Sequence, residues 1–278
     1  RTMIGDIVPM AAVSATAAGA TLICVESRVG PRSAGWAMLL LGALAGYLSR
    51  GLLVVALPLL SVGLPALLQR SAAGNVRRPW PALCLVAFGL VALGAFVSLA
   101  LVNLGSTSTL RAAGMPFVDP DPDSSTFDRV FRHLGHGLFP LSALLPVAFA
   151  SLAKVDEADP RRALGKAVLL AGSSFGLVAS VLLTPLAGNL PFFGVGFLAG
   201  VLGVHLDGLR RAQLSRLSLI ISVLALGVLH VDIQRSPVRL LEGFALPGLE
   251  LDPTFLGHTG LSRSTLLLLA ALLLSTVT

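Results

Sequence analysis

Two charged residues at the edges of apolar runs are the first candidates for chemistry in this sequence. Asp6 precedes the apolar run that begins at Ile7, and Arg50 lies between the runs that end at Leu48 and begin at Leu52. A carboxylate at the edge of hydrocarbon is usually paired or metal-bound, although an Asp that caps a helix N-terminus explains the position equally well. A guanidinium is well shaped to bind a phosphate, and the structural alternative is an Arg that extends to lipid headgroups. Arg50 could therefore bind a phosphate and Asp6 a metal ion or a basic partner, with a purely structural role left open for each residue.

A second group of candidates directly precedes a later apolar run. On a helix, Asp128 and Arg132 form an i,i+4 pair, as do Arg129 and His133. His133 and His136 are three residues apart, a spacing that can hold a metal ion. No third ligand is evident nearby, so an amphipathic helix in the membrane interface is the favoured interpretation. We keep Arg129, Arg132, His133 and His136 as candidates for a loop that contacts a donor or an acceptor.

The composition indicates that membrane-spanning helices position these residues. Of the 278 residues, 55% are hydrophobic and 12% are charged, and the mean hydropathy is +0.87. A soluble domain carries about 25% charged residues, so this chain has too little polar surface to face water. Its apolar runs do not alternate with polar residues, as the strands of a membrane β-barrel would. We expect an all-α, polytopic transmembrane helix bundle.

The apolar runs predict about nine spans within a single transmembrane domain that covers residues 1–278. Each crossing needs roughly 20 apolar residues, so the shorter runs are expected to extend into their flanks or to be re-entrant. The predicted spans are Ile7–Val25, Ala34–Leu48, Leu52–Leu68, Trp80–Leu104, Leu134–Leu152, Ala167–Leu186, Phe192–Leu206, Leu217–Leu229 and Ser264–Thr278.

Basic residues predict the orientation of this bundle, because short cytoplasmic loops carry an excess of Lys and Arg. One set of short segments holds twelve of the 20 basic residues: 28–33, 69–79, 153–166 and 207–216. If these face the cytoplasm, the N-terminal end of the first span, Arg50 and the long loops 105–133 and 230–262 are extracytoplasmic. The net charge of +6 is then explained by topology and by contact with membrane lipid, so no nucleic-acid partner is expected.

Several short motifs occur in an order that is typical of one family. Gly5-Asp6-Ile7-Val8-Pro9-Met10 opens an apolar helix, a second helix ends in Tyr47-Leu48-Ser49-Arg50-Gly51, and the next contains Pro58 and Pro65. This order resembles the middle of bacterial GT-C superfamily membrane glycosyltransferases of the protein mannosyltransferase and aminoarabinose transferase type. The segment 127–152 is similar to the aromatic-rich periplasmic stretch of that family. The resemblance spans most of the chain and rests on short motifs.

The resemblance implies a reaction and a role for three residues. The family moves a sugar from a polyprenyl-phosphate carrier to an acceptor on the periplasmic side, which implies a multi-pass protein of the bacterial inner membrane. By resemblance, Asp6 matches an acidic position that helps to hold the donor phosphate, often through a divalent metal such as Mg, Mn or Zn. Arg50 matches a basic residue that binds the lipid phosphate, and Arg1 matches the polar position ahead of the Asp.

The sequence also departs from the pattern of that family. The catalytic-base Asp of the family lies in a loop upstream of the matched segment, so we expect this chain to be a fragment with its base outside it. Arg50 stands where Lys is the commoner residue. Two other functions remain open: a membrane transporter, which would want charged residues near the midplane, and a non-catalytic membrane scaffold.

Overall fold

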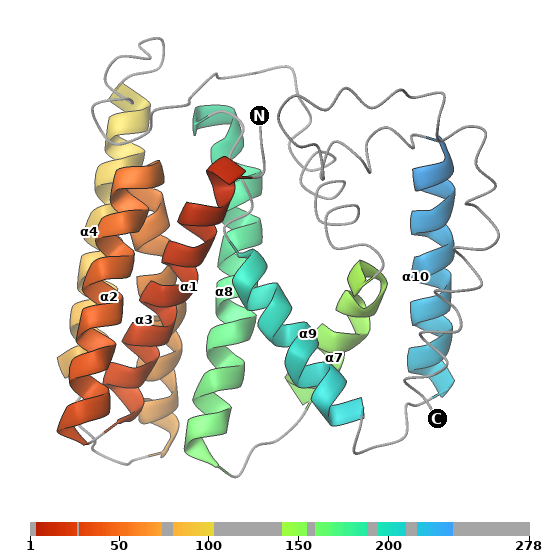
Figure 1. The fold of residues 1–278 in the computed structure, drawn as a ribbon, viewed down its shortest axis with the longest axis horizontal. Coiled ribbons are helices and arrows are strands. Elements are labelled where there is room, and N and C mark those ends of the chain that lie inside the picture. The colour runs from red at the N-terminus through yellow and green to blue at the C-terminus, as the bar shows by residue number, and fades with distance from the viewer. Residues whose placement is uncertain are drawn as a thin grey trace. The chain divides into compact units, whose positions relative to one another are not determined.

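A computed structural model of the chain describes residues 4–26, 28–73, 80–102, 141–154, 159–187, 194–209 and 216–235. Every regular element in these residues is a helix, which confirms the predicted all-α class for this part of the chain (Figure 1). The elements are α1 (Ile4–Val25), α2 (Val29–Arg50), α3 (Leu52–Ala73), α4 (Trp80–Val102), the 3-10 helix η1 (Leu141–Leu144), α7 (Leu145–Lys154), α8 (Pro160–Ala187), α9 (Val195–Leu209) and α10 (Arg216–Arg235).

Four of the described helices are long and apolar enough to cross a membrane, and two further apolar helices are shorter. The chain is therefore a membrane protein by the length and composition of its helices, whereas the prediction of nine spans goes beyond these four. The four stretches are Ile7–Val25, Leu52–Gln69, Trp80–Leu99 and Pro160–Leu182, and the two shorter ones are Leu141–Ala153 and Val195–Asp207.

Several helices extend past the ends predicted from apolarity. α2 begins at Val29 rather than Ala34, and α8 begins at Pro160 rather than Ala167. α10 continues to Arg235, so the predicted loop 230–262 begins inside a helix, and its remainder lies outside the described residues. The reason is that apolarity marks the part of a helix that suits hydrocarbon, while the backbone hydrogen bonds continue into polar flanks. The predicted span Ser264–Thr278 and the loop 105–133 lie outside the described residues.

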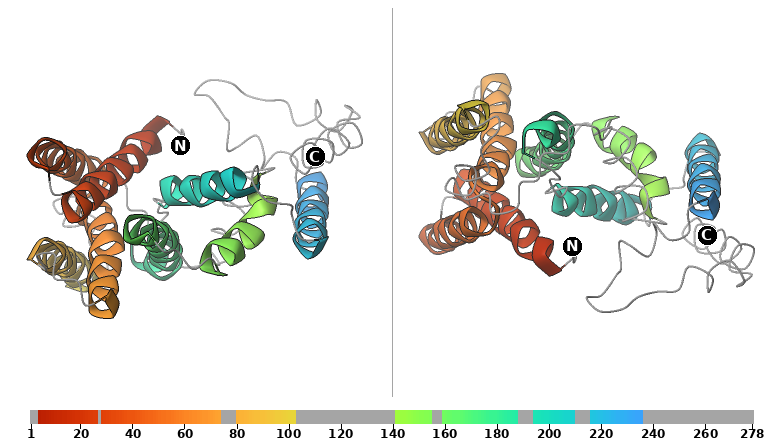
Figure 2. Two further views of the ribbon diagram at one scale, coloured as in Figure 1. Left: turned by 90° about the horizontal axis from the view of Figure 1, so that it is seen from below. Right: turned by 90° about the horizontal axis from the view of Figure 1, so that it is seen from above.

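The chain divides into two compact units. The larger unit comprises residues 6–127 and 156–199, and the smaller comprises residues 1–5, 128–155 and 200–278. In the smaller unit, α10 packs against η1 and α7. In the larger unit, α3 is the central helix, because it packs against α2, α4 and α8 (Figure 2). α3 is also the most completely buried of the four long apolar helices, and its side chains supply much of the core.

Small residues bring α1 and α2 of the larger unit unusually close together. A Cβ atom built on Gly19 would lie 2.5 Å from the carbonyl oxygen of Gly35, and one on Gly42 would lie 2.6 Å from Thr16 Oγ1. Contacts that run from Gly19 with Gly35 to Thr16 with Gly42 show that the two helices are antiparallel. Glycine at such positions lets backbones approach, which is how helices associate where lipid surrounds them.

Candidate functional site

Asp6 and Arg50 lie at the same end of the α1–α2 pair. Asp6 is in the first turn of α1, and Arg50 is the last residue of α2. Gly46 of α2 lies beside Ala12 of α1, since a Cβ atom built on Gly46 would be 3.5 Å from Ala12 Cβ. This contact is the reference point from which positions along both helices are compared. At 1.5 Å per helical residue, Asp6 lies about 9 Å and Arg50 about 6 Å beyond that contact, so the two backbones end at nearly the same level. The sequence-predicted pair is thus brought to one end, while the side chain of Asp6 lies outside the described part.

A glycine turn holds Arg50 between two helices. Gly51 is the single residue that separates α2 from α3, with φ of 81° and ψ of −160°. Its amide donates to the carbonyl oxygen of Tyr47 at 2.9 Å, which ends α2. Residues with a Cβ atom are strained in this backbone region, so the glycine that follows Arg50 is a conformational requirement. A half-buried Arg50 is therefore fixed at a helix C-terminus, where a positive charge is also favoured by the helix dipole.

The other predicted site residues fall in segments that the structure does not describe. Arg1, Arg129, Arg132, His133 and His136 all lie outside the described residues. Within the described residues, no group of three or more His, Cys, Asp or Glu side chains could hold a metal ion. A metal at Asp6 accordingly stays a prediction, and any ion there would need oxygen ligands from a substrate or from other parts of the chain.

A buried polar pair in the smaller unit was not predicted from the sequence. His205 in α9 is 6% exposed, and its Nδ1 lies 2.8 Å from the hydroxyl of Ser151 in α7. The same hydroxyl lies 2.9 Å from the carbonyl oxygen of Ala148, while His205 Nε2 is buried and has no hydrogen-bond partner among the described residues. A single histidine inside the predicted span Phe192–Leu206 was the available signal, since intramembrane ionisable residues are functional candidates by default.

The geometry of the pair limits its protonation states. A hydroxyl has one proton, so Ser151 donates either to the Ala148 carbonyl oxygen or to His205 Nδ1. In the first case the imidazole carries its proton on Nδ1 and presents Nε2 as an acceptor; in the second case Nε2 carries the proton. Either arrangement joins α7 to α9 by a polar contact and leaves one ring nitrogen able to bond a further group.

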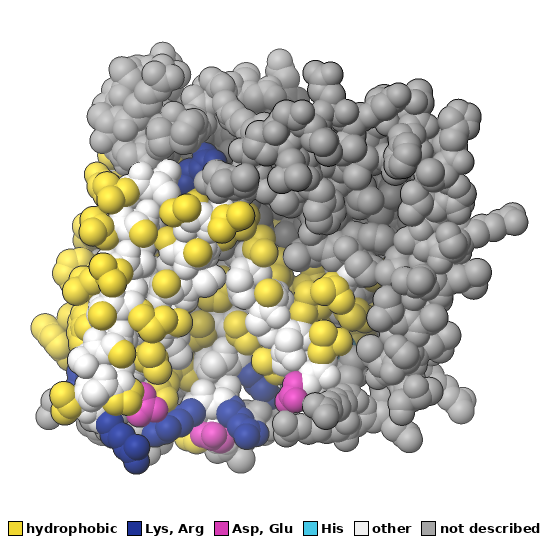
Figure 3. Space-filling model, in the orientation of Figure 1, with side chains coloured by type: hydrophobic (Ala, Val, Ile, Leu, Met, Phe, Trp, Pro, Cys, Tyr) yellow, Lys and Arg dark blue, Asp and Glu magenta, His cyan; other side chains and the backbone are white. Residues whose placement is uncertain are grey.

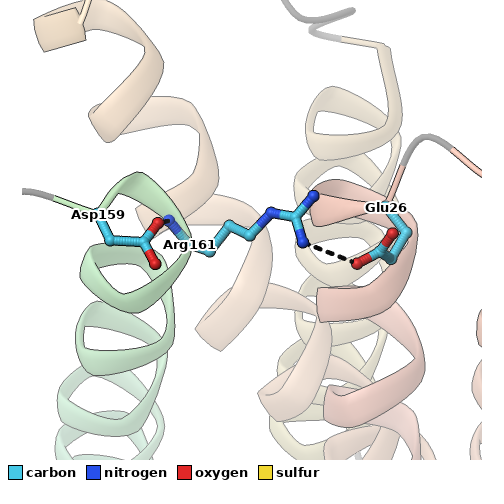
Figure 4. A network of polar contacts seen from close by, with 3 residues as sticks. All are labelled: Glu26, Asp159 and Arg161. Carbon is cyan, nitrogen blue, oxygen red and sulfur yellow. Dashed lines mark hydrogen bonds and ion pairs between the residues drawn. The ribbon is translucent and has the colours of Figure 1, made fainter.

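Charged side chains gather at the end of the larger unit that is opposite to Arg50. Figure 3 shows Lys, Arg, Asp and Glu side chains below the apolar surface of these helices. Arg161, near the start of α8, reaches across to Glu26 at the end of α1, with Nη1 3.3 Å from Oε1 (Figure 4). Asp159 Oδ1 accepts a hydrogen bond from the Arg161 amide at 2.9 Å, which caps α8. This ion pair links two helices that are far apart in the sequence.

Comparison of the chain with protein-family models, with curated proteins and with solved structures finds no match in any of the three. The resemblance to GT-C glycosyltransferases therefore stays a prediction, which rests on the Asp6 and Arg50-Gly51 motifs and their order along the chain.

Proposed function

We propose that this chain is the membrane module of a GT-C-type glycosyltransferase that moves a sugar from a polyprenyl-phosphate carrier to an acceptor on the extracytoplasmic side. The observation that supports the proposal is that Asp6, in the first turn of α1, and Arg50, the last residue of α2, reach the same end of an antiparallel helix pair. Two residues of opposite charge at one end of an apolar helix pair suit a phosphate together with a metal ion.

The chemistry of the two residues fits a lipid phosphate. Mg²⁺ is commonly bound by one or two carboxylates together with substrate phosphates and water, so the Asp6 carboxylate would hold such an ion. When bound, the ion supplies positive charge to the phosphate that leaves the sugar. Arg50 supplies a permanent charge and a planar pair of donors for the phosphate oxygens. Gly51 keeps Arg50 at this end of the helix, and the general base belongs to a segment upstream of the family's matched region.

The test is sugar transfer by the full-length protein in membranes, with a polyprenyl-phosphate sugar as donor. Asp6→Asn and Arg50→Gln are each expected to lower kcat/KM by about a hundredfold, the effect of losing a charged contact of roughly 3 kcal/mol. Arg50→Lys should restore part of the activity, because it keeps the charge and loses the planar donors.

Two matched variants at the opposite end serve as controls. Asp159→Asn keeps an N-cap residue on α8, and Arg162→Gln removes an exposed charge that lies 3.9 Å from Asp159. Both are expected to leave transfer within about twofold of the parent, as exposed ion pairs contribute little. Undiminished transfer in Asp6→Asn would reject the metal role of Asp6, and solute flux without any transfer would instead support a transporter.

A further inference from the structure

The end of the larger unit that carries Glu26 has three arginines close to one short junction in the backbone. Arg28 is the N-cap residue of α2, and Arg32 lies in the first turn, with its amide 3.2 Å from the Arg28 carbonyl oxygen. Glu26 is two residues before Arg28, so their Cα atoms are within about 7 Å of each other. Arg161 joins this junction through its ion pair with Glu26. We name Arg28, Arg32 and Arg161 the arginine clamp.

The arginine clamp carries more positive charge than its described neighbours balance. Among the described residues, Glu26 is the one carboxylate in an ion pair with a member of the clamp, at 3.3 Å from Arg161. Three arginines against Glu26 and Asp159, whose Oδ1 accepts from the Arg161 amide at 2.9 Å, leave an excess of one positive charge at this point. Arg161 is 56% exposed and Glu26 is 21% exposed, so a further anion can reach the guanidinium groups. The chemistry of the clamp therefore suits a phosphate oxyanion.

The surface next to the clamp identifies the source of that phosphate. Trp36 lies one turn beyond Arg32 on α2, and Leu40 lies one turn beyond Trp36; each step turns about 40° around the helix, away from the stripe of Gly35 and Leu39 that packs against α1. Trp36 and Leu40 are exposed, and Leu44 and Leu48 extend the exposed apolar face towards Arg50. An exposed Trp beside a basic residue at the end of an apolar helix is typical of the membrane interface. A headgroup at the clamp would thus have its acyl chains beside α2.

We propose that the arginine clamp is a binding site for an anionic phospholipid, with its phosphate held by Arg28, Arg32 and Arg161 and its acyl chains against the exposed face of α2. In the free protein Glu26 occupies Arg161, so the carboxylate and the lipid phosphate compete for one guanidinium. Glu26 therefore sets the affinity of the site. This site lies at the opposite end of α2 from Arg50 and does not depend on the proposed sugar transfer.

The proposal predicts that one variant weakens lipid binding and another strengthens it. Purified full-length protein in mild detergent is titrated with phosphatidylglycerol, and binding is followed by native mass spectrometry and by the shift of Tm. Arg32→Gln is expected to weaken binding roughly fivefold, since each basic residue near an anionic surface contributes about this factor. Glu26→Gln is expected to tighten binding about threefold, because Arg161 is released for the phosphate. A folding defect cannot produce tighter binding, so the second variant separates the site from general damage.

Three controls distinguish a specific lipid site from diffuse charge attraction and from a site for free phosphate. Arg162→Gln removes the same charge at the same end and should change binding by less than about twofold; a loss equal to that of Arg32→Gln would show diffuse attraction and overturn the proposal. Phosphatidylcholine should not compete. Inorganic phosphate and glycerol 3-phosphate, at equal phosphorus concentration, should not displace the lipid. Displacement by either would overturn the lipid assignment in favour of a free phosphate site.

Discussion

The two ends of the α1–α2 pair hold their charged side chains in different ways. At one end, Arg50 is held by a glycine turn of a single residue and is half-buried. At the other end, Arg28, Arg161 and Arg162 are exposed, and the ion pairs of Arg161 and Arg162 are formed by side-chain tips rather than by a fixed backbone. The difference teaches that a single constrained charge is suited to a defined ligand. Where several charges are exposed, no single one of them determines the binding of an anion.

The close packing of α1 against α2 determines where the ends of the two helices lie. Disrupting that packing is therefore expected to have the largest effect on the free energy of unfolding. Gly19→Leu should lower the free energy of unfolding by about 3 kcal/mol or more, because its Cβ would lie 2.5 Å from two backbone atoms. Gly94→Leu, in α4, is the matched control, since a Cβ there meets no atom within 4 Å. Unfolding followed by circular dichroism in detergent measures both. Equal stability of the two variants would contradict the close approach of α1 and α2.

The backbone constraint at the Arg50 end should have the next largest effect. Gly51→Ala is expected to lower the free energy of unfolding by about 1–3 kcal/mol, because φ of 81° with ψ of −160° is strained for any residue with a Cβ. Gly30→Ala, near the start of α2, has open space and no positive φ, and alanine favours the helix. Thermal unfolding of the two variants tests the contrast. If Gly30→Ala were the more damaging, the two ends would not differ as described.

The ion pair at the opposite end should matter least for stability. Arg161→Gln is expected to change the free energy of unfolding by less than about 1 kcal/mol, because the guanidinium is 56% exposed and screened by solvent. The same variant in about 1 M salt should show an even smaller difference, since the Debye length falls to about 3 Å. A loss as large as that of Gly51→Ala, measured by the same unfolding assay, would show that this end is also rigidly built.

Helix ends were predictable where a conformational signal interrupts the sequence. Gly51 separates two apolar runs, and the predicted start of the following helix at Leu52 agrees with the structure. The predicted start of α8 at Ala167 is seven residues too late, although Asp159 followed by Pro160 is a capping residue ahead of a favourable first helical position. Apolarity does not mark the polar first turns of α2 and α8, which is why these turns are predicted as loops although they are helical.

Contacts between distant segments were not predictable in the same way. Gly42 and Gly46 form a spacing typical of close helix packing, but the sequence does not say that Thr16 and Ala12 lie opposite them. Ser151 and His205 are 54 residues apart, and only the folded chain joins them. For the candidate site, the alternation of predicted spans puts Asp6 and Arg50 on one side of the membrane, and the antiparallel packing of α1 and α2 adds that they end at nearly the same level.

The one-residue link at Gly51 has a consequence for how α2 and α3 can move. A single residue spans at most about 3.6 Å, so the ends of α2 and α3 that flank Gly51 cannot separate. The two helices also pack against each other. They therefore shift as one unit, and any displacement of α3 carries Arg50 with it.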